Sequence, residues 1–150
     1  MIAQELKELF IRDLNRLKKE ISLYKNESTM WVLNEEIKNT AGNLALHLCG
    51  NLKHFIGATL NGSDYKRERE KEFSNKNISS EEIKKNIDES IDVVENYFDG
   101  VNENDFDKLF PINVFKKEMT TRHMIIHLYG HLNYHLGQIN YHRRLLDAHA

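Results

Sequence analysis

The sequence predicts an all-α protein, a four-helix bundle, from three observations. Proline occurs once and glycine seven times in 150 residues, so long tracts can run as uninterrupted helix. Strand-like alternation of apolar and polar residues is hard to find. Four tracts instead repeat apolar residues every three or four positions. Four long amphipathic helices indicate that residues 1–150 form a single helical-bundle domain.

The four predicted helices follow one another along the chain. The first is marked by one apolar stripe, made of Ile2, Leu6, Leu9, Phe10, Leu14, Leu17, Ile21 and Tyr24. The second is expected over about 40–60, the third over about 80–98 and the fourth over about 121–146. Ser79 and Glu82 have the spacing of a capping box, which predicts where the third helix begins.

Two long connections separate the later helices. The charged segment 61–80 is long enough to cross from one end of a bundle to the other, and segment 99–118 is of similar length. Antiparallel neighbours need only short loops. The helices are therefore not expected to run simply up, down, up and down.

Composition excludes several classes of partner. The 21 basic and 23 acidic residues nearly cancel, so we expect no nucleic-acid partner and no membrane surface. No apolar run approaches the ~20 residues of a membrane span, which predicts a soluble cytoplasmic protein. The single cysteine, Cys49, cannot form an internal disulfide, and we expect it to be a small core residue.

Histidines gather on one face of the fourth predicted helix. In "HLYGHLNYHLGQINYH", residues 127–142, the imidazoles of His127, His131, His135 and His142 point within an arc of roughly 80°. The second helix carries its own polar line, which comprises Asn43, His47, Asn51 and His54. A buried imidazole left unpaired costs on the order of 1–3 kcal/mol, and a metal ion satisfies several at once.

The spacing of these histidines is suited to a metal ion. Residues i and i+4 of a helix can share one ion, so His131 pairs with either His127 or His135. A third ligand must come from another helix, where His47 and His54 are the candidates. Those two lie about 10.5 Å apart along their helix, so one of them at most can join a given ion.

Carboxylates are missing from both histidine-bearing helices. Neither residues 37–63 nor residues 119–146 contain an Asp or Glu. This excludes a di-iron bundle, which needs glutamate ligands, and a helical metalloprotease, which needs the glutamate of H-E-x-x-H. The predicted site is all-nitrogen and mononuclear, lacks an adjacent base, and suits a borderline divalent ion such as zinc or nickel.

The motifs "HLCGN" at 47–51 and "HLNYHLGQI" at 131–139 resemble those of the DinB-like, damage-inducible bacterial proteins, and in particular a subfamily of unknown function. The resemblance extends from about residue 31 to 146. It implies a four-helix bundle with up-down-down-up topology, commonly a homodimer, with one divalent metal on three histidines. Carried over to this sequence, the metal positions are His47, His131 and His135.

Some members of that superfamily transfer low-molecular-weight thiols, so the resemblance implies a metal-dependent thiol transferase. Its substrates would be a small-molecule thiol and an electrophile, in stress response or detoxification. A metal-bound thiol is deprotonated, so no protein base is needed. The alternatives are a non-catalytic metal-binding stress protein and a metal-dependent hydrolase, which would need a base from the first or third helix.

Further residues are expected around this site. If the second and fourth helices are antiparallel neighbours, His54 and His127 lie one to two turns from the metal and line its entrance. Asn51 and Gln138 are the other candidates for a second shell or substrate pocket. The alternative for His54, and the expectation for His123, His142 and His149, is a solvated or packed surface position. Four helical glycines at spacings of seven predict close approach between helices: Gly50, Gly57, Gly130 and Gly137.

Overall fold

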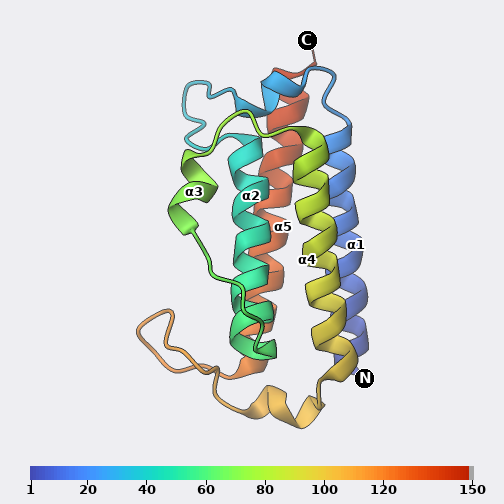
Figure 1. The fold of residues 1–150 in the computed structure, drawn as a ribbon, viewed down its shortest axis with the longest axis vertical. Helices are drawn as coiled ribbons and strands as arrows, with labels where there is room; N and C mark the ends of the chain where they lie inside the picture. The colour runs from blue at the N-terminus through green and yellow to red at the C-terminus, as the bar shows by residue number, and fades with distance from the viewer. Residues whose placement is uncertain (149–150) are drawn as a thin grey trace.

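The computed structural model describes residues 1–148 and is a bundle of four long helices (Figure 1). These are α1 (Ile2–Ser22), α2 (Ala41–Leu52) with its π-helical continuation η2 (Lys53–Leu60), α4 (Ser80–Gly100) and α5 (Thr121–Leu146). The short elements are η1 (Glu27–Trp31), α3 (Arg69–Ser74) and η3 (Glu103–Asp107). No strand occurs within residues 1–148. The predicted all-α bundle is confirmed, and its helices lie close to where they were expected, except that α1 ends at Ser22, before Tyr24.

The helices run up, down, down and up in chain order (Figure 1). The close neighbours are α1 with α4 and α5, and α2 with α4 and α5. The consecutive pairs α1–α2 and α4–α5 therefore sit across diagonals, while α2 and α4 are parallel. A diagonal or a parallel pair cannot be joined by a tight turn, so three connections are long: 23–40, 61–79 and 101–120. The sequence predicted connections 61–79 and 101–120 as long, but it did not predict the helix α3 within connection 61–79.

Side-chain caps explain where three of the long helices begin. The hydroxyl oxygens of Thr40, Ser79 and Thr120 each accept a hydrogen bond from the backbone N–H three residues later. Such a cap satisfies one of the backbone donors that a helix leaves unpaired at its first turn. The expected start of α4 at Ser79 is thereby confirmed, with Glu82 N–H as the donor.

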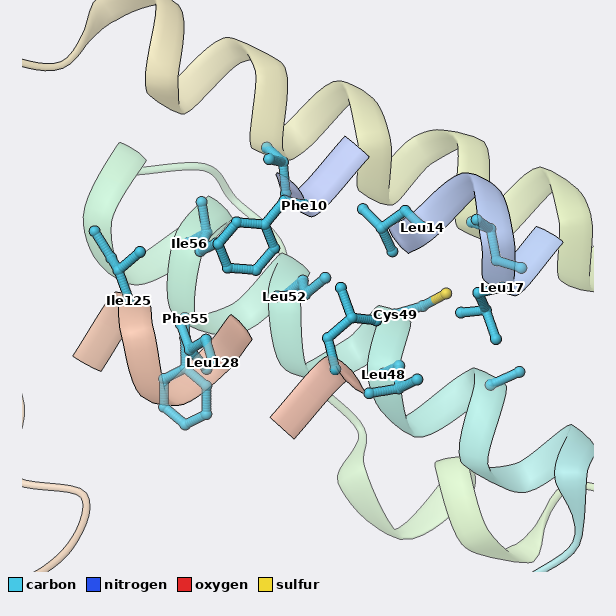
Figure 2. Close-up of a cluster of buried hydrophobic side chains, with 14 of the residues drawn as sticks. Phe10, Leu14, Leu17, Leu48, Cys49, Leu52, Phe55, Ile56, Ile125 and Leu128 are labelled. Atoms are coloured by element: carbon cyan, nitrogen blue, oxygen red, sulfur yellow. The ribbon is translucent and has the colours of Figure 1, made fainter. Parts of the chain in front are cut away.

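The core lies along the axis of the bundle. Figure 2 shows Phe10 and Leu14 of α1 in one buried cluster with Leu48 and Leu52 of α2. Cys49 is fully buried among them, as expected of a small core residue, and burial raises the pKa of its thiol to about 11. None of the described helices is long and apolar enough to cross a membrane.

A buried carboxylate joins α1 to α5. Asp13 is fully buried and accepts hydrogen bonds from Arg12 (2.9 Å), Arg16 (3.0 Å) and the Tyr129 hydroxyl (2.6 Å). Burial would raise the pKa of Asp13, but the hydrogen bonds from Arg12 and Tyr129 outweigh it and hold the pKa below its ordinary value. Its charged form therefore stabilises the folded bundle.

We expect Asp13→Asn to lower the free energy of unfolding by about 1–3 kcal/mol at pH 7, because it weakens hydrogen bonds at a buried site. The folded-state pKa is lowered, so this stabilisation is present above the unfolded pKa of about 3.9 and is lost as pH falls through the folded pKa. Urea titrations from pH 7 to pH 3 measure both effects. Asp88→Asn, which breaks the exposed Lys18–Asp88 pair, should cost at most about 1 kcal/mol. Equal losses in the two variants would contradict this interpretation.

Candidate metal centre

Three histidines from two helices converge at one point. His47 comes from α2, and His131 and His135 come from α5, which packs antiparallel beside it (Figure 1). One ring nitrogen from each lies within 4.8 Å of the others, and the Nε2 atoms of His47 and His131 are 3.1 Å apart. The arrangement can accommodate one metal ion. These are the same three histidines that the resemblance to DinB-like proteins implied as metal ligands.

The local environment keeps two of these imidazoles neutral. Burial, followed by the neighbouring His135 and His47, lowers the pKa of His131 to about 3. Burial likewise lowers the pKa of His135. Only a neutral imidazole offers a nitrogen lone pair to a metal. The site therefore holds His131 and His135 in the ligating form at neutral pH.

Glu72 of α3 fixes the orientation of the His47 ring. His47 Nδ1 donates to Glu72 Oε1 at 3.0 Å, and Arg67 donates to both carboxylate oxygens at 2.9 Å. Burial would raise the pKa of Glu72, but the hydrogen bonds from His47 and Arg67 lower it. A proton on Nδ1 leaves the lone pair on Nε2, which faces the other two histidines.

This carboxylate was missed by the sequence analysis. The two histidine-bearing helices do lack acidic residues, but the connection 61–79 supplies Glu72 from outside them. The expectation that no carboxylate adjoins the site is therefore wrong. Glu72 contacts the nitrogen that faces away from the cluster, so the three converging donors remain nitrogens.

Gly50 makes room for that carboxylate. A Cβ atom at Gly50 would lie 1.9 Å from Glu72 Oε2, so no other residue fits without displacing it. Gly57 faces α4, where a Cβ would come within 3.1 Å of Val93. At Gly130 and Gly137 a Cβ would meet nothing within 4 Å. The predicted close approach between helices is thus confirmed at Gly57. The same prediction is wrong, within this chain, for Gly130 and Gly137 of α5.

Asn51 and Gln138 are the two amides expected near the site. Each lies about one helical turn after a histidine of the cluster, on the same helix. Gln138 Oε1 accepts a hydrogen bond from His135 Nδ1 at 2.7 Å, which turns the other nitrogen of His135 toward the cluster. Asn51, one turn after His47, is buried, and its Oδ1 has no hydrogen-bond partner among the described residues. His131 Nδ1 is likewise buried and unpartnered. A second-shell role for these amides stays a prediction.

His54 and His127 have different aromatic neighbours. His127 is exposed, and its ring lies 4.8 Å from that of Phe115 and 6.4 Å from that of His131. His54 contacts the Phe55 ring, and no aromatic contact joins it to His127 within the described chain. His127 is therefore beside the cluster, and the shared entrance predicted for the two histidines stays a prediction.

The remaining histidines differ in environment. His123 is exposed, as expected. His142 is buried rather than at the surface, because connection 23–40 folds over it: Nδ1 accepts from the Tyr24 hydroxyl at 2.7 Å and Nε2 donates to the Val32 carbonyl at 2.8 Å. His149 lies outside the described residues.

We expect Gly50→Ala to destabilise the protein by about 1–3 kcal/mol, because the new methyl group must displace Glu72 or the helix. Chemical denaturation measures the loss. Gly100→Ala is the matched control, since a Cβ there meets nothing within 4 Å, and it should be neutral or stabilising by up to about 1 kcal/mol. A neutral Gly50→Ala would mean that Glu72 does not occupy this space.

Residues 3–150 match the model of a protein family described as "Protein of unknown function (DUF1572)". No curated protein and no solved structure matches the chain. Because the family match extends over nearly the entire sequence, this protein belongs to the DUF1572 family.

Proposed function

We propose that this protein binds one divalent metal ion through His47, His131 and His135. The observation that carries the proposal is the convergence of three ring nitrogens within 4.8 Å. Two of the three rings are held at their far nitrogen by Glu72 and Gln138, which is how metal-binding histidines are usually oriented. Imidazole donors favour zinc or nickel.

The activity we propose is metal-dependent transfer of a low-molecular-weight thiol to an electrophile. Three protein ligands leave a further coordination position, and a divalent ion there would lower the pKa of a thiol that occupies it. The thiol loses its proton to solvent, its sulfur bonds to an electrophilic carbon, and the leaving group departs with its electron pair. The similarity of HLCGN and HLNYHLGQI to DinB-like proteins supports this choice.

The surroundings favour thiol transfer over hydrolysis. A hydrolase needs a base near the open metal position, whereas Glu72 is engaged by Arg67 and by the far side of His47. A thiol needs no such base, because coordination itself removes its proton. We place the activity in stress response or detoxification in the cytoplasm, where small thiols are kept reduced.

Metal analysis tests the site. Protein purified without an affinity tag that binds metal should contain close to one divalent ion per chain, and His131→Ala should lose it because two ligands remain. His123→Ala is the matched control, since His123 is an exposed histidine of the same helix, and it should keep the ion. Full occupancy in His131→Ala would refute the ligand assignment.

An assay with a panel of thiols and a generic electrophile tests the activity. The metal-loaded protein should accelerate thioether formation with at least one thiol, and metal removal or His131→Ala should return the rate to the uncatalysed value. A loaded protein with no acceleration for any thiol would favour the alternative, a non-catalytic metal-binding stress protein. That result would refute thiol transfer while leaving the metal site standing.

A further inference from the structure

The outer face of α5 carries uncovered apolar side chains, with the exposed residues Arg144 and His127 at its two edges. Four large side chains on it are at least half exposed: Ile126 (50%), Tyr134 (66%), Tyr141 (61%) and Leu145 (66%). Gly130 and Gly137 lie between them, with open space where a Cβ would be. At 100° per residue these six positions fall within an arc of about 100°. The arc lies opposite the buried face of α5, which includes Leu128, Leu132 and Ile139.

The sizes of these six residues are arranged symmetrically about the midpoint between His135 and Leu136. Counting outward in both directions, Tyr134 mirrors Gly137, Gly130 mirrors Tyr141, and Ile126 mirrors Leu145. An antiparallel copy of the same helix, centred on this point, would put each mirrored pair at one height. A large ring would then stand over each glycine, and the two aliphatic residues would meet at each end.

We propose that the outer face of α5 binds the same face of a second copy of this chain, about a two-fold axis between residues 135 and 136. A two-fold interface must be self-complementary, and here each large residue finds a small or apolar counterpart. Glycine at the contact between the two copies of α5 allows their backbones to approach closely. From Ile126 to Leu145 the contact runs for about 28 Å at 1.5 Å per residue.

Exposed apolar residues in two loops extend this surface. Phe115 packs on His127 near one end of the face, and the Val32 carbonyl is held by His142 near the other end. His127 and His142 lie toward the same edge of the face, since they are about 50° and 110° from its centre in the same direction. A two-fold axis that lies in the interface, perpendicular to both helices, keeps that edge on the same side of the interface in both copies. Phe115 of one copy would therefore meet Val32 and Leu33 of the other, and all three are exposed.

The same geometry would bring the second copy beside a pocket. A cavity of about 340 Å³ beside α5 is lined in part by Gln138, Tyr141 and Leu145. Residues 138–145 of one copy stand level with residues 133–126 of the second. The second copy's His127 and Phe115 would therefore stand beside the cavity. Gln138 also holds His135, so each copy would supply part of the wall beside the other copy's proposed metal site. The interface itself does not depend on the metal.

Sedimentation velocity at tens of micromolar protein tests the interface. The wild-type chain should have twice the 17.7 kDa protomer mass. Gly137→Glu should shift it to the protomer mass, because a charged side chain then fills the contact between the two copies of α5. The protomer should stay helical by circular dichroism, since a Cβ at position 137 meets nothing within 4 Å. Gly100→Glu, at an equally open glycine of α4, should remain a dimer. A monomeric wild type, or a dimer that survives Gly137→Glu, would overturn the proposal.

Cross-linking tests the antiparallel arrangement, using the fact that the native Cys49 is buried. An equal mixture of Ile126→Cys and Leu145→Cys should cross-link with a short bismaleimide, because the two positions meet at one height. Ile126→Cys alone should not, since its two copies would lie about 28 Å apart. The reverse pattern, with Ile126→Cys alone cross-linking, would refute the two-fold axis described here. Neither outcome bears on metal content, so a failure of this interface is distinct from a failure of the metal site.

Discussion

The buried hydrogen bond between Glu72 and His47 is the interaction on which the arrangement of the site depends. It ties the 61–79 connection to α2, and it selects the tautomer of His47 that presents Nε2 to His131 and His135. Arg67 satisfies the same carboxylate, and Gly50 leaves the space that the carboxylate occupies. A buried charge left without its partner typically costs about 3–5 kcal/mol, so these residues act as one unit.

The order of the helices explains why this unit comes from a connection. Because α2 and α4 are parallel, the chain must travel the length of the bundle between them. That path runs along α2 and places Arg67, Glu72 and Phe73 against His47. The diagonal between α4 and α5 likewise requires a long connection, which brings Phe115 onto His127. The bundle holds the three histidines, and the connections supply the groups around them.

The helices were predictable because they depend on periodicity, which also reduced the candidate ligands to a few histidines, and the resemblance to DinB-like proteins then selected His47, His131 and His135. The i, i+4 spacing of His131 and His135, and the single polar line through His47, restrict the possible partners to a few residues. Glu72 was not predictable from spacing, since it is one of several acidic residues in a charged segment and its helix has six residues. Gly50, one turn from His47, did indicate that another group packs closely there, but this glycine was interpreted as a sign of helix–helix contact. His142 was misassigned because its partners lie 118 and 110 residues away.

The most direct test of this account is a crystal structure of the metal-loaded protein, with anomalous diffraction at the edge of the bound metal. The account predicts one anomalous peak, with the ring nitrogens of His47, His131 and His135 about 2.0–2.1 Å from the ion and Nε2 as the donor of His47. Glu72 should remain on the opposite nitrogen of His47. An ion bound by the Glu72 carboxylate, by Nδ1 of His47, or away from these three histidines would contradict it.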